Sequence, residues 1–249
     1  MSIIDAFRLD GKVAVVTGAN TGLGQGMSVA LAQAGAKVVG VARRSCEDTK
    51  KLIEGDGGEF AEVIADLSDM SAIDVIVNGA LAAFGKVDIL VNNAGISIIG
   101  LFQDMTRDEW DRIMNVNVGS VYNCCHFAIP DMINAKSGRI INISSVWGNV
   151  GASCEVAYSA CKGGVNSFTR ALGKELAPSN IQVNAIACGV IDTDMNRCFS
   201  EEERSALIEE IPAGRMGSPE EVASLAYSLA TASSYLNGCL LYTSPSPRD

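Results

Sequence analysis

A tyrosine and a lysine stand in the sequence where one face of a helix would bring their side chains together. Tyr158 and Lys162 are four residues apart, which is about one helical turn. A free phenol has a pKa of about 10, and a neighbouring ammonium group favours the phenolate and lowers that pKa. A phenol tuned in this way can exchange a proton with the oxygen of a carbonyl or an alcohol. Many helices contain such a pair by chance, so the prediction depends on the residues around it.

A serine supports this interpretation. Ser145 lies 13 residues before Tyr158, at the carboxyl end of a predicted strand over residues 139–144. Parallel α/β sheets bind ligands at the carboxyl ends of their strands. The Ser145 hydroxyl could therefore hold a substrate oxygen beside the phenol.

A glycine-rich turn follows the first predicted strand and precedes a helical pattern. Glycines permit a sharp turn and let the backbone approach a pyrophosphate, and a helix N-terminus offers free N–H groups to phosphates. The turn therefore predicts a dinucleotide site, and the alternative is an ordinary tight turn in a chain that contains 25 glycines. The candidate contacts in the turn are Gly18, Asn20, Thr21, Gly22, Leu23 and Gly24.

The end of the second predicted strand carries two arginines. Enzymes that use NAD commonly have an acid at this position for the ribose 2′-hydroxyl, whereas NADP needs positive charge there. Here Ala42 takes the place of the acid, and Arg43 and Arg44 follow. Guanidinium groups pair strongly with phosphate. The arginines favour NADP(H) over NAD(H), and the alternative is a solvated basic pair at the start of a helix.

These residues need a fold that brings strand ends together, and the hydrophobic pattern predicts one. Short apolar runs at 13–16, 38–41, 60–65, 87–91, 139–143 and 181–186 alternate with helical patterns at 24–34, 71–84, 107–132 and 158–176. Alternating strands and helices predict a parallel sheet with helices on both faces. We therefore expect a single α/β domain with a doubly wound, Rossmann-like sheet.

The motifs together resemble those of the short-chain dehydrogenases/reductases. The resemblance covers residues 8–240 or so and rests on the Thr17–Gly24 turn, on Asn92-Asn93-Ala94-Gly95 and on the Tyr158/Lys162 pair. The first ninety residues look most like 2-dehydro-3-deoxy-gluconate 5-dehydrogenases. From Ile96 onward the chain looks more like 3-oxoacyl-(acyl-carrier-protein) reductases, so a chimeric chain joined at 92–96 is one interpretation.

The resemblance implies roles for individual residues. In the family the second serine of such a pair is catalytic, which selects Ser145 over Ser144. Asn117, rather than the nearby Asn115, matches the asparagine that bends a helix and holds a water in a proton relay toward Lys162. The catalytic set is then Asn117, Ser145, Tyr158 and Lys162.

The resemblance also implies cofactor contacts beyond the glycine turn. Asp66 matches the aspartate that accepts a hydrogen bond from the adenine amino group, and Leu67 follows it. Asn93, Ala94 and Gly95 would line the ribose side, Tyr158 and Lys162 would also contact the cofactor, and Gly189, Ile191 and Thr193 would hold the nicotinamide carboxamide. Cys188 stands where family members usually have proline, and we expect a modest loss of rigidity there.

Composition excludes several other classes of protein. A net charge of −10 argues against a nucleic-acid partner. No apolar run is long enough to cross a membrane, and the N-terminus lacks an export signal, so we expect a cytoplasmic protein. The eight cysteines form no Cys-x-x-Cys unit and His126 is the single histidine, so we expect no metal site and no Ser-His-Asp hydrolase.

The leading prediction is an oxidoreductase that moves a hydride between NADP(H) and a carbonyl or secondary alcohol, most like a 3-oxoacyl-(acyl-carrier-protein) reductase, with a small or carrier-bound acyl substrate. The alternatives are an NAD-dependent sugar-acid dehydrogenase and a non-catalytic cofactor-sensing protein. A sugar acid needs an arginine in the pocket and a carrier needs a basic patch at its entrance. Arg197, Arg204 and Arg215 are candidates for either.

The ends of the chain yield two further expectations. The region 194–216 resembles the substrate lid of the family. The domain should extend over 1–241, whereas 242–249 contains two prolines, departs from the family's closing strand and predicts a disordered tail of non-native character. Helices 107–132 and 158–176 resemble the family's dimer faces and predict a homodimer or homotetramer.

Overall fold

The computed structural model describes residues 5–69, 72–196 and 199–244. Its centre is a seven-stranded sheet with the order β3-β2-β1-β4-β5-β6-β7, in which every pair of neighbours is parallel. The strands are β1 Val13–Thr17, β2 Lys37–Ala42, β3 Phe60–Ile64, β4 Ile89–Asn92, β5 Gly138–Ser145, β6 Ile181–Cys188 and β7 Leu240–Tyr242. The expected doubly wound parallel sheet is confirmed.

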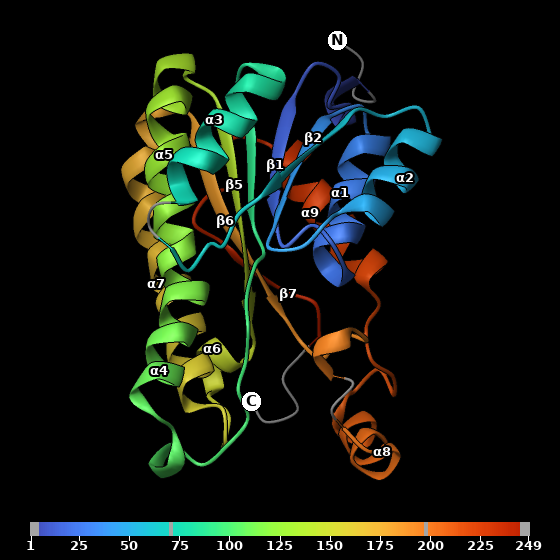
Figure 1. The fold of residues 1–249 in the computed structure, drawn as a ribbon, viewed down its shortest axis with the longest axis vertical. Coiled ribbons are helices and arrows are strands. Elements are labelled where there is room, and N and C mark those ends of the chain that lie inside the picture. The colour runs from blue at the N-terminus through green and yellow to red at the C-terminus, as the bar shows by residue number, and fades with distance from the viewer. Residues whose placement is uncertain (1–4, 70–71, 197–198, 245–249) are drawn as a thin grey trace.

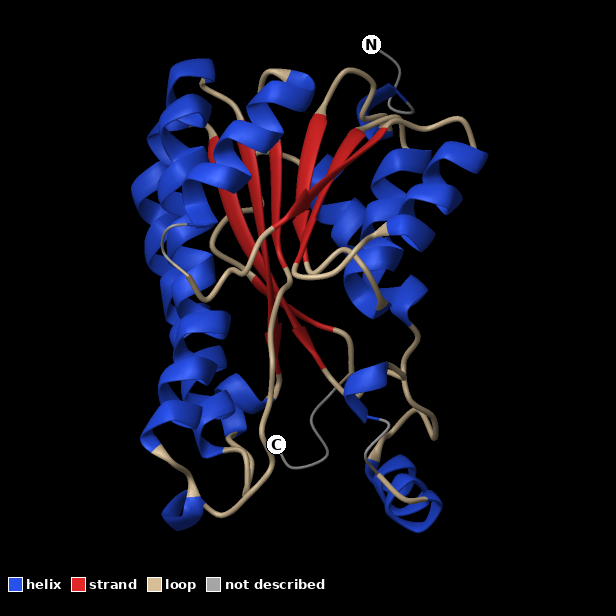
Figure 2. Cartoon of the chain, viewed as in Figure 1, coloured by secondary structure: helices blue, strands red, loops and turns tan. Residues whose placement is uncertain are grey.

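Helices cover both faces of the sheet (Figures 1 and 2). On one side lie α3 Ala72–Phe84, α5 Ser120–Ala135 and α7 Val156–Leu176, and on the other lie α1 Gly22–Gln33, α2 Glu47–Gly55 and α9 Pro219–Thr231. The remaining helices are α4 Arg107–Met114, α6 Trp147–Val150 and α8 Glu201–Glu210, with 3₁₀ turns at Asp5–Phe7, Phe102–Asp104, Ala177–Ser179 and Asp194–Asn196.

The strands are apolar on both sides because both faces are covered. All residues of β1 and of β6 are buried. One apolar cluster packs α1 and α9 against the sheet through residues such as Met27 and Val222, and another packs α3, α5 and α7 through residues such as Ile76 and Met132. Burial on this scale is the main favourable term in folding and fixes the sheet as a rigid platform.

Two central strands extend beyond their neighbour at the carboxyl edge. In the register of the sheet Asn92, the last residue of β4, pairs with Asn142, whereas β5 continues to Ser145 beside Cys188 of β6. In Figure 1, α4 and α6 lie on one side of this edge and α8 on the other. The extension places the predicted serine beyond the end of β4, where side chains of several elements meet.

The expected start of the tail at residue 242 is wrong. Tyr242 belongs to β7 and pairs with Ala187, and the Thr243 hydroxyl accepts a hydrogen bond of 3.0 Å from the Gly189 N–H. Tyr242 can extend the strand because the prolines come only after Ser244. The rest of the expected tail, 245–249, lies outside the described residues.

Candidate active site

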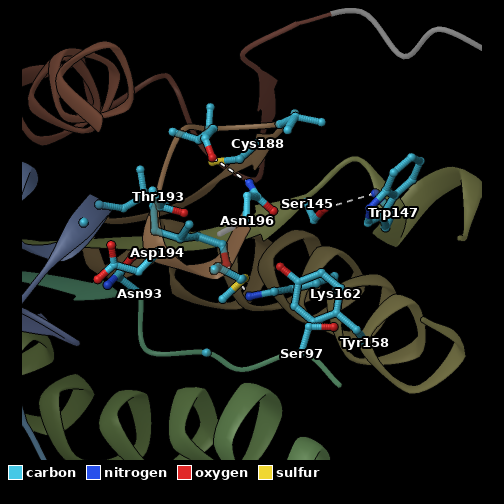
Figure 3. Close-up of a pocket in the computed structure, with 18 of the residues that line it drawn as sticks. Asn93, Ser97, Ser145, Trp147, Tyr158, Lys162, Cys188, Thr193, Asp194 and Asn196 are labelled. Carbon is cyan, nitrogen blue, oxygen red and sulfur yellow. Dashed lines mark hydrogen bonds between the residues drawn. The ribbon is translucent and has the colours of Figure 1, made fainter. Parts of the chain in front are cut away.

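A cavity of about 610 Å³ opens at the carboxyl edge of the sheet. Figure 3 shows Ser145, Tyr158 and Lys162 around one space, with Asn93 and Thr193 at its other end. The predicted residues that line the cavity are Gly18, Asn20, Thr21, Gly22, Leu23, Asn93, Ala94, Gly95, Ser145, Tyr158, Lys162, Gly189, Ile191 and Thr193. The chain thus brings the predicted proton-transfer residues and the glycine turn to the same cavity.

The glycine turn has the backbone geometry that its sequence implies. Gly18 and Gly22 have φ angles of +68° and +55°, in the left-handed region that favours glycine. A side chain on Gly24 would lie 2.6 Å from the Gly18 carbonyl carbon, so α1 packs directly on the turn. Thr21 caps α1 without a side-chain hydrogen bond, which leaves the N–H groups of the first helical turn to a ligand. These features fit a pyrophosphate.

The turn after β4 holds the ends of the central strands together. The Thr17 hydroxyl accepts hydrogen bonds from the N–H groups of Asn93 (2.9 Å) and Ala94 (3.0 Å), and the Asn93 amide donates to the Thr17 carbonyl at 2.8 Å. The Asn92 amide donates to Asn142 Oδ1 on β5 at 2.8 Å. These hydrogen bonds tie the carboxyl ends of β1, β4 and β5 together.

The two serines at the end of β5 have different surroundings. The Ser144 hydroxyl donates to Asn166 Oδ1 at 2.5 Å and lies 3.3 Å from the Lys162 carbonyl oxygen, so it ties β5 to α7. The Ser145 hydroxyl accepts the Trp147 N–H at 3.2 Å and lies close enough to the Tyr158 phenol to lower the pKa of that phenol. Ser145 is thus the serine beside the phenol, as predicted.

Burial shifts the pKa values of the tyrosine and the lysine. Burial is the main cause that raises the pKa of Tyr158, the charge of Glu155 is one of the causes that raise it further, and the Ser145 hydroxyl lowers it. Burial lowers the pKa of Lys162 to about 8. The Lys162 ammonium lies 5.4 Å from the centre of the Tyr158 ring and donates to the Ile143 carbonyl at 2.9 Å. The expected lowering of the phenol pKa by lysine is not seen: Lys162 is not among the groups that shift the pKa of Tyr158, and burial raises that pKa.

Asn117 interrupts the helix that the sequence predicted over 107–132. A π-helical turn, Asn115–Gly119, separates α4 from α5. The buried Asn117 amide donates to the Ile96 carbonyl (2.8 Å) and to the Ile113 carbonyl (3.0 Å), and its oxygen accepts the Ile96 N–H. This side chain inserts into the backbone ladder, so the helical pattern over 107–132 forms two helices that are interrupted at the asparagine for which the resemblance implies a bend. Asn115 is exposed and makes none of these contacts.

The predicted adenine-side residues lie outside the cavity. Arg43 and Arg44 are exposed directly after β2. Asp66 Oδ1 accepts hydrogen bonds from the Ser68 N–H and hydroxyl, which lower the pKa of Asp66, and the charge of Arg43 lowers it further. Arg43 and Asp66 thus interact across the ends of β2 and β3, while the next residue, Leu67, is buried.

The segment after β6 keeps its geometry despite the cysteine. Cys188 is the last residue of β6, and its carbonyl accepts the Val146 N–H at 3.0 Å. Gly189, Ile191 and Thr193 follow along the cavity wall, and Thr193 approaches the glycine turn at Gly22. A β-strand can continue through a cysteine as readily as through other apolar residues, so the strand reaches its full length.

Several residues that line the cavity were missed by the sequence analysis. They are Ser97, Ile99, Trp147, Glu155, Val190, Asp194, Met195, Asn196, Phe199 and Leu207. They belong to the loops after β4, β5 and β6 and to the lid region. The resemblance of 194–216 to a substrate lid indicated the region of Asp194 to Leu207 without naming its residues. For Trp147 and Glu155 the available signal was their proximity in sequence to Ser145 and Tyr158, which does not show where their side chains lie.

The described arginines of the lid region are engaged in ion pairs. Arg204 pairs with Asp192 at 2.8 Å, and Arg215 pairs with Glu221 at 2.6 Å. Neither lines the cavity. The third candidate, Arg197, lies outside the described residues.

Of the helices in the described part of the chain, none is long and apolar enough to cross a membrane.

The sequence of this chain is similar to those of known dehydrogenases and reductases. The short chain dehydrogenase family model matches residues 12–204. The chain is 38% identical to the 3-oxoacyl-(acyl-carrier-protein) reductase of Thermotoga maritima over 93% of this chain and 95% of that protein. It is 40% identical to the 2-dehydro-3-deoxy-D-gluconate 5-dehydrogenase of Escherichia coli over 95% of both. Each relative matches nearly the whole chain, so these matches do not divide it near residue 96.

A solved structure is also similar over nearly the whole chain. The protein from Agrobacterium tumefaciens assigned as a 2-deoxy-D-gluconate 3-dehydrogenase, with bound NADP, superposes with a TM-score of 0.90 at 36% identity over 96% of this chain and 97% of that one. The sequence identities and the structural superposition thus point to the same family as the motifs around the cavity. The chain belongs to the short-chain dehydrogenase family of oxidoreductases.

Proposed function

We propose that this chain is an NADP(H)-dependent carbonyl reductase whose proton donor is Tyr158. The observation that carries the proposal is the meeting of Ser145, Tyr158 and Lys162 on the wall of the cavity that the glycine turn also lines. A non-catalytic cofactor sensor would not need to preserve all three side chains in one site.

The residues divide the work of carbonyl reduction. The Ser145 and Tyr158 hydroxyls hold the carbonyl oxygen, and the phenol gives it a proton. A phenol is protonated at neutral pH, and burial raises the pKa of Tyr158 further, which suits an acid. Lys162, charged below its pKa of about 8, stabilises the phenolate that remains, and Asn117 supports the nearby backbone. Bound cofactor supplies the hydride.

The cofactor preference rests on the end of β2. Arg43 and Arg44 are exposed there, Ala42 offers no carboxylate, and Asp66 lies close enough to Arg43 for their charges to interact. A 2′-phosphate could pair with two guanidinium groups at the end of β2, whereas Ala42 has no carboxylate to accept a hydrogen bond from a ribose 2′-hydroxyl. In the same proposal Asp66 and Leu67 flank the adenine, Asn93 to Gly95 the ribose, and Gly189, Ile191 and Thr193 the carboxamide.

The substrate side of the cavity favours a carbonyl compound without a carboxylate group. Ile99, Trp147, Met195 and Leu207 supply apolar surface, and the charged residues among the described lining are Glu155, Asp194 and Lys162. The two carboxylates on the cavity wall would repel a sugar acid. A 3-oxoacyl thioester, free or bound to a carrier, fits this lining better.

A substrate panel with both cofactors tests the proposal. Oxidation of NADPH and of NADH is followed with an acetoacetyl thioester, the same acyl group on its carrier protein, and a keto-sugar acid. We expect turnover of the thioesters with NADPH. Preference for the keto-sugar acid would instead select the alternative that the Escherichia coli relative supports. Turnover of no carbonyl with either cofactor would end the enzyme proposal.

Assembly and location are part of the proposal. We propose a cytoplasmic homodimer or homotetramer, without nucleic-acid or membrane partners, in which α5 and α7 form the first interface. Tyr122 and His126 stack on α5 with Tyr122 exposed, and would be covered there. Light scattering after size exclusion measures the assembly, and a monomer at all concentrations would contradict it.

A further inference from the structure

A carboxylate and a hydroxyl lie together on the cavity wall outside the proton-transfer group. Ser97, in the loop after β4, donates a hydrogen bond of 2.5 Å to Glu155 Oε1. Both residues line the cavity and both are partly exposed to it. In Figure 3, Ser97 lies next to the Tyr158 ring. This pair therefore borders the space where a substrate would meet the phenol.

The position of Glu155 makes this contact unusual. Glu155 immediately precedes α7, where a carboxylate normally accepts hydrogen bonds from the first turn of its own helix. Its side chain makes no such bond and reaches Ser97 instead. The neighbouring loop is held independently, since the Gly100 N–H donates to the Cys154 carbonyl at 2.9 Å. Glu155 thus presents its charge to the cavity rather than to its helix.

The charge acts at short range on the reacting group. Glu155 is three residues from Tyr158, and its charge is one of the causes that raise the pKa of that phenol. An ionised carboxylate accepts about four hydrogen bonds, and Ser97 donates one of them. Among the described residues that line the cavity, Lys162 is the one with a positive charge, and it bonds to the backbone of β5.

We infer that Glu155, held by Ser97, is a specificity-determining residue that selects carbonyl substrates with a hydrogen-bond donor near the carbonyl and rejects those with a carboxylate there. The inference rests on the proposed carbonyl reduction and adds the chemical class of the substrate. The donor is a hydroxyl, an amide N–H or an ammonium group.

The test uses four ketones that differ at one end. Butan-2-one bearing a terminal methyl, hydroxyl, ammonium or carboxylate group is reduced with saturating NADPH, and each kcat/KM is divided by that of the methyl compound. We expect the hydroxyl and ammonium ratios to exceed one, and the carboxylate ratio to lie below one. Comparison of the hydroxyl compound with the ammonium compound shows which hydrogen-bond donor the site prefers.

Three variants separate charge from structure. Glu155→Gln keeps an acceptor for Ser97 but removes the charge, Glu155→Leu removes both, and Glu54→Gln on the exposed face of α2 is the matched control. In Glu155→Gln we expect the ammonium ratio to fall, and the carboxylate ratio to rise, by about 10-fold or more, as for hydrogen bonds to charged groups. Glu155→Leu should also lose the hydroxyl preference. Ratios equal to those of the wild type would overturn the inference.

A binding measurement keeps this test separate from the proposed function. Trp147 lines the cavity, so its fluorescence in a Trp110→Phe background reports the binding of the four matching alcohols to the NADP⁺ complex. If no ketone is reduced, the proposed function fails, while binding ratios still decide the role of Glu155. Equal binding of donor and carboxylate alcohols would overturn it.

Discussion

Replacement of Gly24 by alanine tests whether the glycine turn and α1 form one rigid cradle. A Cβ at this position would lie 2.6 Å from the Gly18 carbonyl carbon and 2.7 Å from Asn93 Nδ2, and nearer still to the Gly18 oxygen. Real Cβ atoms do not approach other atoms within 3.0 Å, so α1 and the turn must separate. Both neighbours are held, since the Asn93 amide also donates to the Thr17 carbonyl.

The size of the effect follows from this geometry. Overpacking costs about 1–3 kcal/mol, which is a fall in Tm of about 2–12 °C for a chain of this length. Displacement of the phosphate-binding backbone should raise the KM for NADPH by about 10-fold to 100-fold. Differential scanning calorimetry and initial rates measure the two effects.

The matched control is Gly55→Ala at the end of α2, where a Cβ meets nothing within 4 Å. It should leave the KM unchanged and leave Tm equal or slightly higher. If Gly24→Ala has the KM and Tm of Gly55→Ala, the packing of α1 on the turn is not what shapes the cofactor site, and the reasoning fails.

Three further perturbations test other parts of the site. Arg43→Asp should raise the KM for NADPH by about 10-fold to 100-fold and spare NADH, and an unchanged ratio of the two would refute the NADP(H) preference. Burial lowers the pKa of Lys162 to about 8, so between about pH 8 and 10 the unfolded chain binds more protons than the native state and the free energy of unfolding rises with pH. In urea titrations the wild type should therefore gain stability relative to Lys162→Met over this pH range. A stability difference that stays constant would contradict burial of the amine. Asn117→Ala should lower the free energy of unfolding by about 1–3 kcal/mol, because the Ile96 and Ile113 carbonyls lose their hydrogen-bond donor. Asn115→Ala should leave the free energy of unfolding unchanged. Equal effects of the two substitutions would contradict the stabilisation of the π-helical turn by Asn117.

The sequence predicted those parts of the fold that depend on local patterns. Runs such as 181–186 became buried strands because parallel sheets are apolar on both faces, and Tyr158 and Lys162 share a face because helical spacing places them there. The break at Asn117 was not predicted as a π-helical turn, since it depends on contacts with Ile96, 21 residues away. Such contacts leave no periodic signal.

The cavity lining was less predictable for the same reason. Glu155 immediately precedes α7, and the contact of its side chain with Ser97 depends on a loop 58 residues away. The raised pKa of Tyr158 reflects how far the assembled site excludes water, which spacing alone does not encode. Motifs therefore identified the chemical groups, and tertiary structure determined their protonation and their neighbours.

The kinetics of Tyr158→Phe test the central proposal most directly. The variant keeps the ring beside Lys162 and removes the hydroxyl that lies near Ser145. With NADPH binding verified by calorimetry, kcat for an acetoacetyl thioester should fall by about 10²-fold to 10⁴-fold, the usual contribution of a general acid. A kcat within a few-fold of the wild type would contradict the assignment of Tyr158 as proton donor.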